Sequence, residues 1–257
     1  MANPIFYSEA LEDATLTYSA TEDAANPIEN VQDRNVNTIF KDTTISANVN
    51  IVIDLGAVRA CDYIFLGNYQ ADGAAVANLT VQANSSDSWP GTEALAATNI
   101  ETAGSYTDKL MTFSTQSFQW WRLVFEGSST VMTNLFISNI FLGTSFQPSL
   151  NRNWGMREGR LSNITQRQTH GAQQFTNKNG AIRKTWSGMS YQDIQETQKD
   201  NTLTLIQNVE NNHKPLYFDP IGDGTEYFVR MQESEHGLND SDFQNYNSDP
   251  IRFIEEI

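Results

Sequence analysis

The sequence contains one cysteine and three histidines, and it has no long apolar run. A lone cysteine cannot close a disulfide within the chain, and the apolar setting of Cys61 (VRACDYIFL) favours a small buried hydrophobe over a nucleophile. The longest apolar patch, residues 135–142, is far shorter than the roughly 20 residues of a membrane-spanning helix. Stability must therefore come from packing or assembly, and membrane insertion is not expected.

Basic residues are scarce as well. The chain of 257 residues has 16 basic and 31 acidic side chains, a net charge of −15. Because an acidic surface repels nucleic acid and anionic lipid, neither is expected as a specific partner. The opening residues MANPIFYSEALED show neither the basic segment nor the apolar segment of a secretory leader. We expect a soluble chain that is made in the cytoplasm.

Sequence motifs of catalysis and metal binding are missing. His170, His213 and His236 lie in unlike contexts, and no nucleophile elbow, paired zinc-protease histidines or phosphate loop occurs. In DPIGDGTE, residues 219–226, isoleucine stands where an EF-hand loop needs an oxygen ligand. The sequence therefore predicts no enzyme, no metal site and no cofactor.

Two domains are predicted, residues 1–145 and residues 146–257. The first has short apolar runs separated by stretches rich in Gly, Asn, Ser, Asp and Thr, a pattern typical of an antiparallel β-sandwich or barrel. Acidic residues outnumber basic ones 16 to 5 before residue 146 and 15 to 11 after it. This change in charge balance supports a boundary near residues 145–150.

The second domain is predicted to contain two or more strands, then one helix, then three further strands. RLSNITQRQTHGAQQF and AIRKTWSGMS predict two strands, with the turn at TNKNG because Asn-Gly is a strong hairpin signal. A helix near residues 190–211 is expected from its apolar spacing, with Ser190 as its cap. Short strands follow, among them KPLYFDP at residues 214–220. There Leu216 and Phe218 are expected on a core face and Tyr217 on a face that meets a neighbouring subunit.

The first domain resembles the discoidin family, a galactose-binding-like jelly-roll fold. The resemblance is carried by Asp33 with Thr38 and Phe40, by Asp54-Leu55-Gly56, by the strand from Tyr63 to Asn68, and by Trp121-Arg122-Leu123. It implies a carbohydrate-binding-like domain, although the fold alone does not guarantee sugar binding. Tyr69 and Trp89, two loop aromatics whose rings could stack on a sugar, are the candidate binding residues. Both could instead pack against their own loops.

The second domain is similar to the ring-forming domain of bacteriophage tail tubes and distal tail proteins, and this resemblance implies a β-sandwich or barrel flanked by one helix. The residues that carry this are Arg183, Lys184 and Trp186, the predicted helix, KPLYFDP, EYFVRM and the closing RFIEEI. The resemblance implies a virion structural protein: a homo-oligomeric tail or baseplate ring that contacts other tail proteins and, through its outer domain, a host-surface glycan.

Opposite charges could hold such a ring together. Residues 147–185 contain seven basic residues and one acidic residue, and residues 186–257 contain four basic and fourteen acidic residues. A basic face on one subunit could meet an acidic face on the next, with Arg152, Arg157, Arg160 and Tyr217 as interface candidates. A charge run could equally be a solvated face. Two alternatives stay open: a stand-alone carbohydrate-binding module and the non-catalytic part of a polysaccharide-degrading enzyme.

Overall fold

The computed structural model shows a mainly β protein and divides it into two compact units. It describes residues 5–7, 11, 13–35, 37–42, 48–72, 76–91, 95–98, 107–127, 134–148, 156–168, 174–190, 194–195, 199–200, 203, 214–232, 238–242, 245–248 and 250–256. The sandwich unit comprises residues 8–145, and the hairpin unit comprises residues 1–7 with residues 146–257. The mainly β fold class predicted from the sequence is confirmed.

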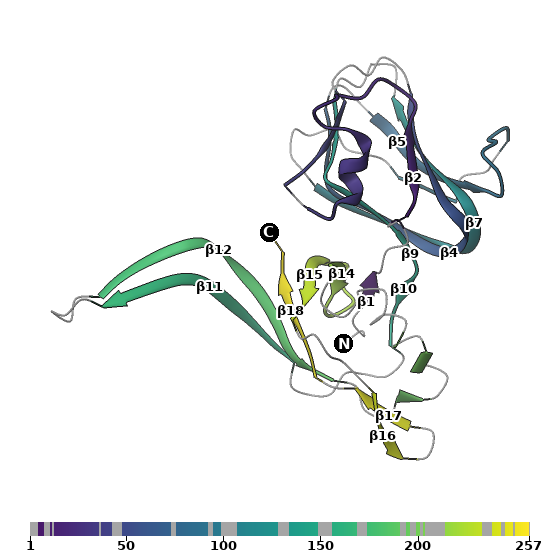
Figure 1. The fold of residues 1–257 in the computed structure, drawn as a ribbon. Coiled ribbons are helices and arrows are strands. Elements are labelled where there is room, and N and C mark those ends of the chain that lie inside the picture. The colour runs from purple at the N-terminus through teal and green to yellow at the C-terminus, as the bar shows by residue number, and fades with distance from the viewer. Residues whose placement is uncertain are drawn as a thin grey trace. The chain divides into compact units, whose positions relative to one another are not determined.

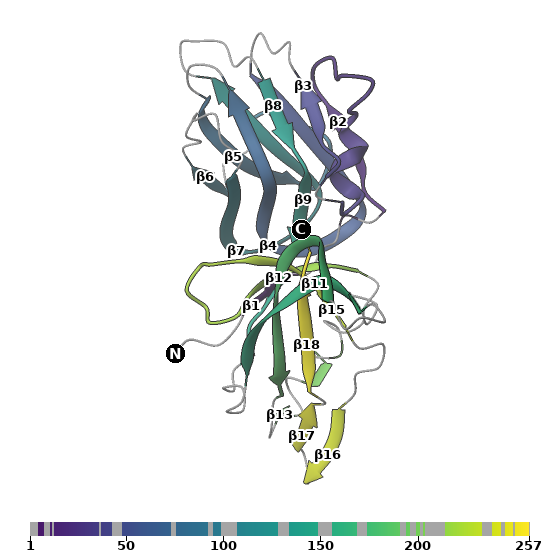
Figure 2. The ribbon, with the colours of Figure 1, turned by 90° about the vertical axis from the view of Figure 1, so that its left-hand side faces the viewer.

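The sandwich unit is built from antiparallel strands that surround one apolar core (Figure 2). Its strands are β2 (Thr15–Tyr18), β3 (Phe40–Asp42), β4 (Val49–Asp72), β5 (Val76–Asn84), β6 (Ala96–Thr98), β7 (Thr107–Gly127), β8 (Asn134–Ile137) and β9 (Asn139–Gly143), and a 3-10 helix, η1, spans Ile28–Gln32. The sheet order is β3-β8-β4-β7-β5-β6, and β2 and β9 also pair with β4. This order places the long strands β4 and β7 at the centre of the unit.

Strand β4 pairs with different partners along its length. Its first part lies between β2 and β7, its middle between β9 and β7, and its end beside β8. Three register shifts interrupt its ladder with β7, as expected for a strand that bends around a core. Cys61 lies in this bent region and is fully buried, as predicted, and burial raises its pKa to about 12.

Two of the motifs that carried the discoidin resemblance, those with Asp33 and Asp54, form local hydrogen bonds within turns. The Thr38 hydroxyl donates a hydrogen bond to Asp33 Oδ2 at 2.5 Å. The carboxylate of Asp54 accepts from the backbone N–H of Gly56 at 2.8 Å, and Gly56 adopts a φ of 69°. Asp33 and Asp54 therefore each stabilise a local turn, the first with Thr38 and the second with Gly56.

The hairpin unit contains a seven-stranded antiparallel sheet in the order β10-β1-β14-β15-β18-β12-β11 (Figure 1). Its strands are β1 (Ile5–Tyr7), β10 (Ser145–Phe146), β11 (Arg157–Gln168), β12 (Gln174–Met189), β14 (Leu216–Asp219), β15 (Tyr227–Met231) and β18 (Ile251–Glu255). A three-stranded sheet adds β13 (Ile194–Gln195), β16 (Leu238–Asp242) and β17 (Asn245–Ser248). One apolar cluster, formed by Phe6, Trp186, Leu216, Phe218, Val229, Met231, Ile251 and Phe253, makes its core.

The chain's first strand belongs to the second half of the sequence. Strand β1 pairs with β14, so Phe6 lies opposite Phe218 and Tyr7 opposite Tyr217. The domain boundaries expected from the charge balance placed residues 1–7 with the first domain, which the pairing does not support. The apolar side chains of β1 explain the difference, because they complete the hairpin-unit core. The sandwich unit is thus inserted between β1 and β10.

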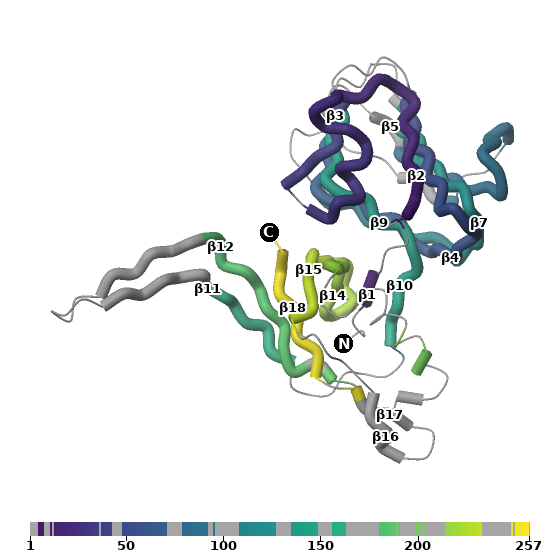
Figure 3. Tube along the Cα trace, in the orientation of Figure 1, coloured from purple at the N-terminus to yellow at the C-terminus, as the bar shows by residue number. Residues whose placement is uncertain are grey.

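The predicted turn at TNKNG is wrong. Residues 174–189 form one strand that runs through Asn179 and Gly180, and β12 lies between β18 and β11 (Figure 3). The ladder with β11 shifts register here, since Ser162 pairs with Ile182 and Ile164 with Lys178. The Asn-Gly pair therefore lies at a β-bulge within a strand rather than in a turn.

The predicted helix near residues 190–211 is only partly described. Ile194 and Gln195 pair with Tyr246 and Asn245, which shows that a helix cannot begin at Ser190. Lys199, Asp200 and Leu203 are helical, and the rest of the predicted helix lies outside the described residues.

Candidate functional site

Trp89 is held in a polar cluster beside strands β5 and β7. The guanidinium of Arg122 lies over its ring, 4.5 Å from the centroid, and its indole N–H donates to Asp87 Oδ1 at 2.8 Å. Arg122 in turn donates from Nε to Gln82 Oε1 at 2.8 Å and also from Nη2. The Trp89 ring is half-buried. It is therefore oriented by polar contacts and still partly open to solvent.

The charges of this cluster nearly balance. Burial lowers the pKa of Arg122, and the nearby Asp87 carboxylate opposes that shift. An arginine stays protonated at any physiological pH, so the guanidinium remains a cation that can donate hydrogen bonds. The cluster combines an aromatic plate with fixed donors and acceptors, which are the groups that recognise a small polar ligand.

Sequence reasoning named Trp89 but missed the contacts around it. The sequence analysis identified Arg122 only as part of the strand motif Trp121-Arg122-Leu123. It did not identify Gln82 or Asp87 as candidate site residues. Gln82 and Arg122 are opposite each other on β5 and β7, a pairing that only the register reveals. The short spacing of Asp87 and Trp89 was the one local signal of the cluster.

Tyr69, the second predicted sugar-binding residue, is not placed to bind a sugar. It lies within strand β4 rather than on a loop, is 3% exposed, and belongs to the sandwich-unit core. A buried ring offers no face to a ligand. Tyr69 packs in the core of its own unit and not against a loop, so neither of the two roles expected from the sequence matches its position.

The predicted interface residue Tyr217 is also buried. Leu216 and Phe218 lie in the hairpin-unit core, as expected, and Tyr217 lies outside that cluster. Yet Tyr217 is 2% exposed, and its ring lies 5.1 Å from that of Phe228. Strand β14 is an interior strand, covered at its edges by β1 and β15. The chain's own strands therefore protect the KPLYFDP segment, and Tyr217 is not available to a neighbouring subunit.

Two of the three predicted interface arginines, Arg157 and Arg160, lie on a long antiparallel strand pair. Arg157 and Arg160 are exposed on β11, and Arg152 lies outside the described residues. Strand β12 pairs with β18 only between Thr185 and Met189, whereas it pairs with β11 from Gln174 to Ser187. Residues 157–168 and 174–184, together named the arm, thus extend from the sheet as a two-stranded ribbon (Figure 1).

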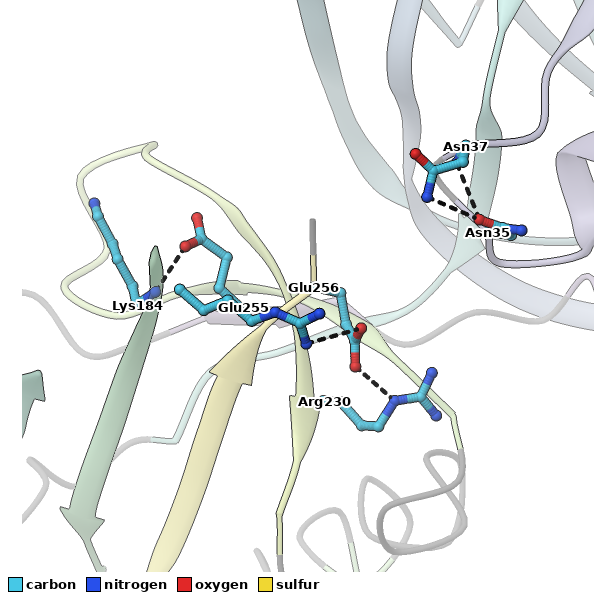
Figure 4. A network of polar contacts seen from close by, with 7 residues as sticks. Asn35, Asn37, Lys184, Arg230, Glu255 and Glu256 are labelled. Carbon is cyan, nitrogen blue, oxygen red and sulfur yellow. Dashed lines mark hydrogen bonds and ion pairs between the residues drawn. The ribbon is translucent and has the colours of Figure 1, made fainter. Parts of the chain in front are cut away.

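Ion pairs fix the base of the arm to the end of the chain. Arg230 Nε lies 2.8 Å from Glu256 Oε1, and Arg183 lies 3.8 Å from the other oxygen of the same carboxylate. The backbone N–H of Lys184 donates to Glu255 at 2.8 Å (Figure 4). Arg183 and Lys184 therefore serve the fold of this unit as well as its charge.

The acidic loop after β14 is a structural turn. The carboxylate of Asp219 is fully buried and accepts backbone hydrogen bonds from Ile221, Gly222 and Gly224 at 2.7–3.1 Å. Across the described part of the chain, no group of three or more acidic, cysteine or histidine side chains is arranged to hold a metal ion. Within the same residues, no helix has the length and apolar character needed to span a membrane.

Comparison with known proteins gives structural likenesses only. No protein-family model matches the sequence, and no curated protein is similar to it. A chitosan-binding module of a chitosanase/glucanase from Paenibacillus sp. IK-5 is 18% identical, with 52% of this chain and 97% of that chain covered and a TM-score of 0.43. A family 32 carbohydrate-binding module from C. perfringens NanJ, solved with galactose, is 14% identical, with 55% and 99% covered and a TM-score of 0.43. A carbohydrate-binding module of a family 31 glycoside hydrolase from Clostridium perfringens is 10% identical, with 53% and 98% covered and a TM-score of 0.44.

Proposed function

We propose that the sandwich unit recognises carbohydrate. The observation that carries this proposal is the cluster in which Arg122 and Asp87 hold the partly exposed indole of Trp89. An indole packs well against the C–H face of a sugar ring because both surfaces are apolar and flat, while neighbouring polar groups bond the hydroxyls. The unit acts as a binding domain, without a catalytic step.

The hairpin unit is proposed to drive assembly. A two-stranded ribbon is at best marginally stable in water by itself. The arm nevertheless exposes apolar side chains, with Leu161 43% and Ile182 46% exposed. It carries six basic residues and one acidic residue, a net charge of +5, and since the whole chain has −15, the other residues sum to −20. These features favour docking of the arm on an acidic protein surface, and copies of the same chain supply one.

The proposed setting is the tail or baseplate of a tailed phage or phage-like particle. The chain would be made in the cytoplasm of the host bacterium and would reside in the virion tail. Its hairpin unit would form a homo-oligomeric ring with other tail proteins, and its sandwich unit would contact a host-surface glycan. The arm and its positive charge support assembly in such a particle. The cluster at Trp89 supports contact of the sandwich unit with a glycan.

The second candidate function is a carbohydrate-binding module that acts alone or as the non-catalytic part of a polysaccharide-degrading enzyme. The cluster at Trp89 favours it equally, because the cluster lies within one unit and needs no assembly. The arm is the feature that this alternative leaves without a role.

Two measurements on the full chain separate these proposals. A glycan array tests carbohydrate recognition, and binding of no saccharide would refute the function of the sandwich unit. Sedimentation velocity over a range of protein concentrations, with negative-stain images, tests assembly. Closed rings support the tail protein, whereas a monomer at every concentration, with and without neighbouring tail proteins, supports the alternative.

A further inference from the structure

The cluster at Trp89 is one end of a larger polar face. In strand β7 the side chains of Trp121 and Leu123 are buried, so Trp120 and Arg122 point to the opposite, solvent side. Trp120 lies opposite Asn84 of β5 and opposite Asp54 of β4. All three side chains are half-buried, as is Arg122. The three strands therefore present two tryptophans and several polar groups on one outer face.

Several polar atoms of this face have no partner among the residues that the structure describes. Asp54 uses Oδ1 to accept hydrogen bonds from Gly56 and Gln119, both at 2.8 Å. Within the described residues, no donor contacts its Oδ2, and no acceptor contacts the indole N–H of Trp120 or Nη1 of Arg122. Among the described residues, one acceptor and two donors on neighbouring strands thus remain without a partner. Sugar hydroxyls, which donate and accept, match such a mixed set.

The charge of the face selects among saccharides. Asp54 and Asp87 contribute two negative charges, and Arg122, which contributes the positive charge, already bonds Gln82. Residues 1–145 carry 16 acidic and 5 basic side chains, which repel anions. An uncharged or amine-bearing sugar meets no such repulsion, whereas a uronic or sialic acid does.

We propose that the outer face of β4, β5 and β7, formed by Trp89, Trp120, Arg122 and Asp54, binds an uncharged or amine-bearing saccharide. The inference rests on the proposed carbohydrate recognition and adds the place and the ligand class. Trp120 supplies a second aromatic plate, and its indole N–H and Asp54 Oδ2 bond adjacent hydroxyls. Arg122 holds Trp89 in place and offers its remaining N–H groups.

The test compares affinities for three soluble probes by isothermal titration calorimetry on the full chain. The probes are lactose oligomers as the uncharged class, glucosamine oligomers as the amine-bearing class, and galacturonic acid oligomers as the anionic class. Trp120→Ala should weaken the binding of the preferred probe at least about ten-fold, as expected for an aromatic anchor. Trp120→Phe, which keeps a ring but removes the N–H, should give a smaller loss. Lys109→Ala, at the far end of β7, is the control and should bind as the wild type does.

The outcomes separate the two levels of the proposal. Loss on Trp120→Ala with unchanged thermal melting, for an uncharged or amine-bearing probe, supports the site and its class. Full affinity in both Trp120 variants would place the ligand elsewhere, which overturns this inference but leaves carbohydrate recognition intact. Preference for the galacturonic acid probe would overturn the ligand class. Binding of no saccharide, on the array or in solution, would overturn the proposed function and the site together.

Discussion

The ring of Phe6 stacks on the ring of Phe218, with centroids 5.2 Å apart, although the two residues lie on either side of the inserted sandwich unit in the sequence. The same ring of Phe6 lies 6.0 Å from Phe253 and 6.2 Å from Phe146. The N-terminal strand is thus a fixed part of the hairpin-unit core.

Truncation of Phe6 should therefore destabilise the hairpin unit, most of whose residues lie beyond position 145. Phe6→Ala is expected to lower the free energy of unfolding of the hairpin unit by about 3 to 5 kcal/mol, the range for a buried phenylalanine. Ile221→Ala, at a position that is 38% exposed in the same unit, is the control and should change it by less than about 0.5 kcal/mol. Thermal and urea unfolding of the full chain measure both. Equal effects of the two variants would show that β1 does not belong to this core.

Tyr217 and Phe218 should both behave as core residues. Phe218→Ala is expected to cost about 3 to 5 kcal/mol. Tyr217→Ala should cost a similar amount, because the tyrosine is 2% exposed and packs on Phe228. Chemical unfolding of the protomer at low concentration measures both changes. If Tyr217→Ala left protomer stability unchanged and impaired only association, Tyr217 would be an interface residue, as predicted from the sequence, and not a core residue.

Asp219 should matter far more than the neighbouring Asp223. Asp219→Ala leaves three backbone N–H groups without their acceptor, so a loss of about 3 kcal/mol or more is expected. Asp223→Ala removes one bond to Thr225 at an exposed site and should cost less than about 1 kcal/mol. The comparison uses urea unfolding at neutral pH. Equal costs would mean that the buried carboxylate does not organise this turn.

Sequence reasoning found what depends on local pattern. The apolar run Leu216–Phe218 after Pro215 predicted the strand at KPLYFDP, and the period of two of a strand predicted the shared face of Leu216 and Phe218. The apolar setting of Cys61 predicted its burial. A buried face of a strand can be recognised from a short stretch of sequence, because its apolar residues recur at every second position.

What depends on contacts between distant residues could not be predicted. Nothing near Tyr217 signals that Tyr7 and Phe228 lie opposite it. Asn179-Gly180 fits a bulge as well as a turn, and only the partner strand decides between them. The face that joins Asp54, Trp120 and Asn84 exists because three strands align in register. Position in a sheet, rather than residue type, produced these differences.

Charge reversal on the arm should weaken association. Arg157→Glu combined with Arg160→Glu changes two exposed positions, so the fold is expected to survive while attraction to an acidic partner is lost. Arg59→Glu combined with Lys109→Glu makes the same change in net charge on the sandwich unit and is the control. Sedimentation velocity at low and high salt compares them, and salt should weaken the association of the wild type because it screens charge. An unchanged oligomer in the arm variant would count against assembly through the arm.

Binding of saccharide to the outer face of β4, β5 and β7 is measured by a ¹H–¹⁵N NMR titration that follows the indole N–H signals of the five tryptophans. We expect a bound lactose or glucosamine oligomer to shift the signals of Trp89 and Trp120, while the signals of the buried Trp121 and Trp186 stay in place. Saturating saccharide that leaves both Trp89 and Trp120 unshifted would contradict binding at this face.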